Sequence, residues 1–167
     1  MTASFTENMA KLILISEESD SRFEKFCCDL FYEVDGILYL PTSQNYDQGR
    51  DGRTSDLRSG SKSAILCATL RKDPIKKASE DVEKIKSKPF LPCIIRSCVL
   101  LNKDKHGDET ERLLDQIKAT FSTIDGVKTV LVDGIIQIAA YAVKYPGIFE
   151  KYYRSELDNL RRIMSQP

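Results

Sequence analysis

Acidic and basic residues alternate with glycines between positions 45 and 53, and this stretch is the part of the chain best suited to chemistry. It reads Asn45-Tyr46-Asp47-Gln48-Gly49-Arg50-Asp51-Gly52-Arg53. Glycine permits tight backbone turns, and the carboxylates of Asp47 and Asp51 beside such a turn suit a hard cation such as Mg²⁺. Arg50 and Arg53 could meet phosphate oxygens. The alternative, which composition alone favours, is a solvated turn whose four charges neutralise one another.

Cations gather in and after this stretch. Residues 50–72 have an excess of four positive charges, made up of Arg50, Arg53, Arg58, Lys62, Arg71 and Lys72 against Asp51 and Asp56. Lys76 and Lys77 follow in the first turn of a predicted helix, where the helix dipole disfavours cations. A bound polyanion would explain them, and its phosphates would give affinity without sequence readout. An ordinary solvated face is the alternative.

The spacing of apolar residues predicts the elements that must position these groups. Helices are predicted at 5–15, 21–35, 74–86, 108–122, 135–146 and 147–164, and strands at 37–41, 63–70, 93–101 and 127–132. Ser21-Arg22-Phe23-Glu24 predicts a capping box, a structural alternative to any chemical role of Glu24. Residues 42–62 are predicted to be a loop or hairpin. The alternation of strands and helices predicts an α/β fold, a central mixed β-sheet flanked by helices.

The length of 167 residues fits a single domain. We expect a helical extension at 1–20, a core at 21–153 and a C-terminal helix at 154–167, which in a longer protein would lead to a further domain. Asp133-Gly134 is interpreted as a turn into a helix. The tyrosines of the last helices are interpreted as packing or surface residues; they are Tyr141, Tyr145, Tyr152 and Tyr153.

Composition argues against several classes of protein. The formal net charge is zero, which argues against a strongly basic, autonomous DNA-binding domain. No run of about 18 apolar residues predicts a membrane span, and the first residues do not resemble a secretion signal, so we expect a cytoplasmic protein. Five cysteines without a CxxC pair, and a single histidine, His106, do not predict a zinc site. We expect buried, reduced cysteines and a solvated His106.

Three features together resemble the Mrr-like branch of the PD-(D/E)XK nuclease superfamily. Phe23-Glu24 matches a Phe-Glu pair on the first core helix, and Gly49-Arg50-Asp51-Gly52 matches a Gly-x-Asp-Gly loop. A buried strand follows, on which the family carries Glu or Gln, any residue, then Lys; here these positions are Cys67-Ala68-Thr69. The resemblance covers roughly residues 20–153 and implies a restriction-endonuclease-like fold. Such domains occur at the N-terminus of antiphage STAND-type NTPases.

The resemblance implies a metal-dependent DNA endonuclease that uses Mg²⁺ or Mn²⁺. Asp51 would be the first metal ligand, with Glu24 and Asp47 next, and the Asp51 carboxylate would lie close to Cys67. Arg71 or Lys72 would supply the cation missing at Thr69. The DNA phosphates would meet a set of basic residues, namely Arg50, Arg53, Lys72, Lys76 and Lys77. The expected partners are DNA and a fused NTPase or sensor module, or a second copy of the chain.

The departure at Cys67 and Thr69 supports a second hypothesis. A thiol is a poor ligand for Mg²⁺, and threonine brings no positive charge to a reacting phosphate. The chain would then be a catalytically inactive nuclease-like domain, kept for DNA binding or self-association. On either hypothesis we expect poor cleavage that Cys67→Glu with Thr69→Lys would raise.

Overall fold

Four parallel strands form the centre of the computed structural model, which describes residues 4–42, 64–70, 72–88, 91–100 and 108–166. The strands are listed in their spatial order: β1 (Leu40–Pro41), β2 (Ala64–Thr69), β3 (Ile94–Val99) and β4 (Thr129–Asp133). Every neighbouring pair is parallel. The predicted α/β class is therefore confirmed. We expected a mixed sheet, whereas the described strands all run the same way; residues 43–63 lie outside the described part.

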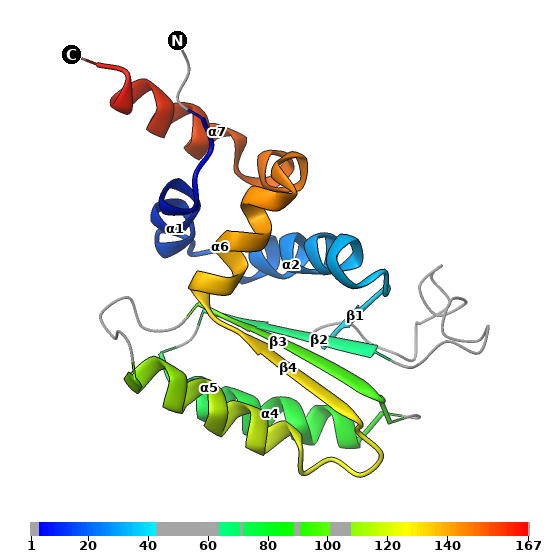
Figure 1. Ribbon diagram of the computed structural model, residues 1–167. Coiled ribbons are helices and arrows are strands. Elements are labelled where there is room, and N and C mark those ends of the chain that lie inside the picture. Colours follow the sequence, from blue (N-terminus) through cyan, green and yellow to red (C-terminus); the bar gives the residue numbers. More distant parts are fainter. Residues whose placement is uncertain (1–3, 43–63, 71, 89–90, 101–107, 167) are drawn as a thin grey trace.

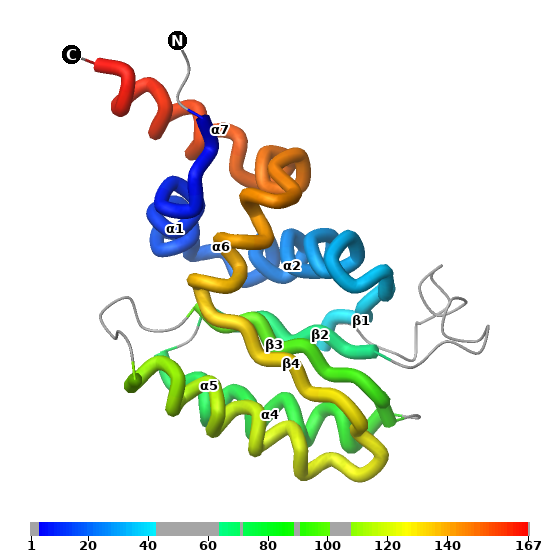
Figure 2. The backbone as a smooth tube through the Cα atoms, in the orientation of Figure 1, coloured from blue at the N-terminus to red at the C-terminus, as the bar shows by residue number. Residues whose placement is uncertain are grey.

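Six helices are described around this sheet. They are α1 (Glu7–Ile15), α2 (Asp20–Asp35), α4 (Pro74–Lys86), α5 (Asp108–Phe121), α6 (Ile135–Lys144) and α7 (Pro146–Met164). Helices α4 and α5 cover one face of the sheet, and α2 lies on the other with α6 beside it (Figure 1). The tube view shows α1 and α7 farther from the sheet, next to α6 (Figure 2).

Strand β2 is buried on both faces, as its unbroken apolar run predicts. Successive side chains of a strand point to opposite faces. Ala64 and Leu66 belong to the core beneath α1, α2, α6 and α7. Ile65 and Cys67 belong to the core beneath α4 and α5. The sheet therefore separates two apolar layers, and each residue of β2 is assigned to one of them.

The N-cap of helix α2 lies two residues earlier than predicted. Ser19 is the N-cap, and the Ser19 Oγ accepts a hydrogen bond from the backbone N–H of Arg22 at 3.1 Å. The predicted capping box of Ser21 and Glu24 is therefore wrong, because both residues lie inside the helix. Glu24 does not have the capping role that was the structural alternative to a chemical one.

The interpretation of Asp133-Gly134 as a turn into a helix is confirmed, because β4 ends at Asp133 and Gly134 is the N-cap of α6. The sequence did not indicate that the Asp133 side chain is also part of a buried ionic cluster. Asp133 ends β4 and is buried, and its carboxylate accepts a hydrogen bond from the guanidinium of Arg96 on β3. Arg96 also donates from Nε and Nη2 to Asp35 at the end of α2, at 3.0 and 3.1 Å. The guanidinium lies 4.1 Å from the ring centre of Phe31. This ionic cluster joins α2, β3 and β4 inside the apolar layer.

Two expectations about composition can be compared with the described residues. None of the five cysteines forms a disulfide, and all except Cys93 are buried, as expected. Among the described helices none has the length and apolar character needed to cross a membrane. His106 lies outside the described residues.

Candidate functional site

A polar pocket opens at the edge of the sheet where β1 and β2 end, and it brings together residues from four elements. Its volume is about 310 Å³, within the lower range of ligand-binding pockets. The residues that line it are Asp20, Ser21, Glu24, Thr42, Ala68, Thr69, Lys77 and Lys84. Two carboxylates, two ammonium groups and three hydroxyls therefore face one small volume.

Helix α2 supplies the acidic wall of this pocket. Asp20 and Glu24 are four residues apart in the first turns of α2, so their side chains lie on one face of the helix. Glu24 is half-buried and Asp20 is exposed. Because Ser19 caps the helix, neither carboxylate is required as the N-cap acceptor.

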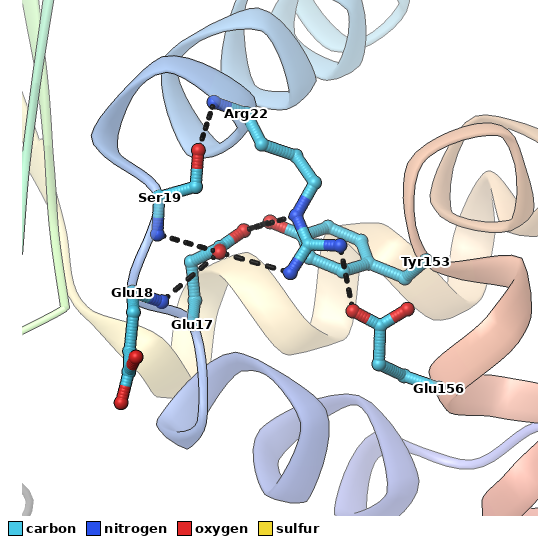
Figure 3. A network of polar contacts seen from close by, with 6 residues as sticks. All are labelled: Glu17, Glu18, Ser19, Arg22, Tyr153 and Glu156. Atoms are coloured by element: carbon cyan, nitrogen blue, oxygen red, sulfur yellow. Dashed lines mark hydrogen bonds and ion pairs between the residues drawn. The ribbon is translucent and has the colours of Figure 1, made fainter.

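A buried carboxylate fixes the chain just before this wall (Figure 3). Glu17 Oε1 accepts hydrogen bonds from the backbone N–H groups of Glu18 and Ser19, at 3.0 and 2.9 Å. Arg22 donates from Nε to Glu17 Oε2 at 2.8 Å, and the Tyr153 hydroxyl donates to the same oxygen at 2.5 Å. Glu17 thus ties the first turn of α2 to α7, and it holds the acidic wall of the pocket in place.

We expect Glu17→Gln to lower the free energy of unfolding by about 1–3 kcal/mol. The amide nitrogen of glutamine is a donor, and it would face the donors of Arg22 and Tyr153 from which Oε2 now accepts hydrogen bonds. Burial alone would raise the pKa of Glu17, but the bonds from Arg22, Tyr153 and Ser19 outweigh it and lower that pKa below 4.5. A carboxyl group whose pKa is lower in the folded chain than in the unfolded chain stabilises the fold at any pH above the unfolded pKa, and this stabilisation is lost as the pH falls. The loss of unfolding free energy in Glu17→Gln should therefore be complete at pH 7 and become smaller below about pH 4.5.

Urea denaturation at several pH values measures this effect. Glu18→Gln is the matched control, since the Glu18 side chain is exposed and points away from the network in Figure 3. Equal stability of the two variants at pH 7 would show that the network does not stabilise the fold.

Strand β2 places Cys67 and Thr69 differently from what the resemblance implied. Thr69 lines the pocket, whereas Cys67 is not among the described residues that line it. The Cys67 thiol is packed under α4, where it interacts with Thr42 and lies near Asp81. Burial, and secondarily the Asp81 charge, raises the pKa of this thiol well above its usual range. The thiol is therefore neutral near pH 7 and buried behind Thr42, which itself lines the pocket.

The predicted basic residues of α4 have different surroundings. Lys76 is exposed, as is Lys72 just before the helix. Lys77 lines the pocket and forms an ion pair with Asp81, with Nζ and Oδ1 2.5 Å apart. Burial raises the pKa of the Asp81 carboxyl, an effect that Lys77 opposes. Lys77 is thus oriented by a buried partner, unlike the two solvated lysines.

Several predicted site residues cannot be placed, because they lie outside the described residues. They are Asp47, Arg50, Asp51, Arg53 and Arg71. The segment 43–63 that contains the first four begins directly after Thr42, a lining residue of the pocket. The predicted proximity of Asp51 and Cys67 stays a prediction.

The donor chemistry of the pocket fits a hard divalent cation in type. Carboxylate and hydroxyl oxygens line it, and Mg²⁺ and Mn²⁺ prefer such oxygens to sulfur. Among the described residues, however, no three Asp, Glu, His or Cys side chains are grouped as a complete metal site. Asp20 and Glu24 therefore offer at most part of a ligand set, which residues 43–63 would have to complete.

Sequence reasoning missed four residues of this region: Asp20, Thr42, Lys84 and Asp81. A local signal existed for Asp20, which precedes Glu24 by one helical turn, and for Asp81, which follows Lys77 by one turn. No such local signal existed for Thr42 or Lys84, because only the folded sheet edge brings them to one pocket.

Comparisons with family models, curated proteins and solved structures gave no match to this chain.

Proposed function

We propose that this chain is a nuclease-like domain that binds DNA and hydrolyses its phosphodiester bonds with the help of a divalent metal ion. The observation that carries the proposal is the convergence of Glu24 and Thr69 on one pocket. The two residues are 45 positions apart, on α2 and β2, and both correspond to functional positions in the Mrr-like resemblance. The segment carrying Asp47 and Asp51 also begins at the rim of this pocket.

The residues have distinct roles in this proposal. Glu24 would hold the metal together with Asp51, and Asp20 or Asp47 would add a further oxygen. A bound divalent ion would activate water and offset charge on the phosphate. The cations near the pocket would attract the DNA backbone, since phosphate contacts supply most of the affinity in sequence-independent binding.

Plasmid cleavage tests the proposal directly. Supercoiled DNA incubated with the chain and Mg²⁺ or Mn²⁺ should be nicked slowly, and chelation of the metal should stop the reaction. Glu24→Gln should lower the rate at least about tenfold, the smallest effect common for disturbed metal sites. Glu33→Gln is the matched control on the same helix, because Glu33 is exposed and does not line the pocket. Cleavage that resists chelation, or that survives Glu24→Gln unchanged, would contradict the assignment.

DNA binding should depend on the exposed lysines next to the pocket. Lys72→Glu and Lys76→Glu should each weaken binding and reduce the slope of log affinity against log salt by about one. Lys118→Glu, the same change near the C-terminal end of α5, should leave the affinity unaltered. Fluorescence anisotropy with a labelled duplex at several salt concentrations gives these slopes. If all three variants bind the duplex with the same affinity, the excess of basic residues in and after residues 50–72 is an ordinary solvated surface.

The second candidate function is DNA binding without catalysis. The observation that favours it is the position of Cys67, a neutral buried thiol where the resembling nucleases have a metal-binding Glu or Gln. Salt-sensitive DNA binding together with no metal-dependent cleavage in the assays above would select this function.

A further inference from the structure

We propose that Lys77, oriented by Asp81, is the catalytic cation of the pocket, acting from helix α4 where β2 has only Thr69. This inference rests on the proposed nuclease function and assigns one of its catalytic groups. It differs from the expectation drawn from the sequence, in which Arg71 or Lys72 supplied the missing charge.

The first argument is position. Lys77 and Thr69 line the same pocket as Glu24. Lys72 is exposed and is not among the described lining residues, although it is closer to Thr69 in sequence. A cation that begins on α4 therefore reaches the space in front of Thr69, whereas Lys72 points into solvent.

The second argument is orientation. A lysine side chain has many rotamers, and an exposed ion pair would restrain it little. Asp81 is different, because its carboxylate is only 3% exposed and its partner Lys77 is 18% exposed. One N–H of the ammonium points at Asp81, which leaves two donors for the pocket. A preorganised donor of this kind stabilises charge that develops in a transition state.

The third argument comes from the second lysine of the pocket. Lys84 lies seven residues after Lys77, about 10 Å along the axis of α4, and it is exposed. Its position suits a flanking phosphate of the bound strand better than the reacting one. The two lysines thus predict different kinetic effects, which makes the assignment of Lys77 testable.

The bond changes define what Lys77 has to do. A water oxygen forms a bond to phosphorus, and one bond from phosphorus to a sugar oxygen breaks. The water proton passes to a solvent base, and the sugar oxygen takes a proton from solvent. Lys77 keeps its own proton, and its two remaining N–H groups face the non-bridging oxygens, where negative charge increases.

Steady-state cleavage kinetics with the whole chain test the assignment. Lys77→Ala should lower kcat about a hundredfold, the loss typical for one such donor, with little change in KM. Lys84→Ala should raise KM and leave kcat nearly unchanged. Lys118→Ala, at an exposed position on α5, is the control for loss of charge alone. Adding Thr69→Lys to Lys77→Ala should restore part of kcat, because the new ammonium enters the same pocket.

Asp81→Asn tests the positioning role through the split between kcat and KM. Without the carboxylate, the Lys77 ammonium loses the partner that orients it, so kcat should fall about tenfold with little change in KM. Asp81→Glu, which keeps a carboxylate at the same helical position, should recover part of kcat.

The outcomes separate the two proposals. If the unaltered chain cleaves DNA and Lys77→Ala keeps its kcat, the role of Lys77 is wrong and the nuclease function stands. If kcat falls in Lys77→Ala but Thr69→Lys restores nothing and Asp81→Asn leaves kcat unchanged, Lys77 is structural and the inference is overturned. If the unaltered chain does not cleave with Mg²⁺ or Mn²⁺, both proposals fail together.

Discussion

Arg96→Met should lower the free energy of unfolding by about 3–5 kcal/mol, the usual result of removing one partner from a buried ionic cluster. Arg96 is 4% exposed and holds Asp35 and Asp133 in one cluster. Methionine fills much of the volume but leaves two carboxylates that face each other in an apolar layer. Their mutual repulsion and poor solvation, rather than lost packing, cause the expected loss.

The dependence of this loss on pH identifies its cause. Burial already raises the pKa of Asp133, and Arg96 opposes that increase. Without Arg96, the pKa of Asp133 should rise further above its unfolded value. A carboxyl group whose pKa is higher in the folded chain than in the unfolded chain favours the fold at low pH, and this contribution to the unfolding free energy is lost as the pH increases. Arg96→Met should therefore be less destabilising at pH 5 than at pH 8.

Two further variants complete the test by urea denaturation. Arg96→Met combined with Asp35→Asn and Asp133→Asn removes the uncompensated charges and should recover part of the stability. Arg112→Met, on the exposed side of α5, should change the free energy of unfolding by less than about 0.5 kcal/mol. A deficit in Arg96→Met that is the same at pH 5 and pH 8 would mean that packing, not charge, is responsible.

Cys67→Glu should destabilise the domain by about 3 kcal/mol or more, even though the resembling nucleases carry Glu or Gln at this position. The Cys67 side chain is 2% exposed and lies near the buried carboxylate of Asp81. A second carboxylate there would lack solvent and meet a like charge, which is costly for a buried ionised group. The larger side chain adds a cost of overpacking, typically about 1–3 kcal/mol.

This result would change how activity should be restored. Cys67→Ala is the matched control and should cost about 0.5–1.5 kcal/mol, similar to the loss of one buried methyl-sized group. Urea denaturation at pH 5 and pH 8 should show a smaller deficit for Cys67→Glu at the lower pH, where the new carboxyl is protonated. A stable Cys67→Glu variant would contradict the expected cost of a second carboxylate at this buried position. Our expectation that Cys67→Glu with Thr69→Lys raises cleavage stays a prediction, and Thr69→Lys alone is the variant that avoids this cost.

The apolar pattern of the sequence was sufficient to predict the main elements and the α/β class. The run at 63–70 predicted β2 at Ala64–Thr69, and Asp73-Pro74 predicted the start of α4 at Pro74. These features are local, because the burial of a strand and the start of a helix depend on residues within one or two turns. The first turn of α2 shows the limit of such signals, because the spacing of Ser21 and Glu24 predicted the wrong cap. Ser19 caps the helix next to Glu17, whose carboxylate accepts a hydrogen bond from Tyr153 of α7, a contact between residues far apart in the sequence.

Only the tertiary structure decided which residues share the pocket and which charges are buried. Glu24, Thr69 and Lys77 come from three elements, and they meet because the first turns of α2, the end of β2 and one face of α4 line the same pocket. Arg96 lies 61 residues from Asp35 and 37 from Asp133, so no local pattern relates them. Strand alternation places Cys67 and Thr69 on one face, but of these two only Thr69, the last residue of β2, lines the pocket. Burial and long-range pairing depend on the whole fold, which is why the sequence determined the elements and the structure selected the site.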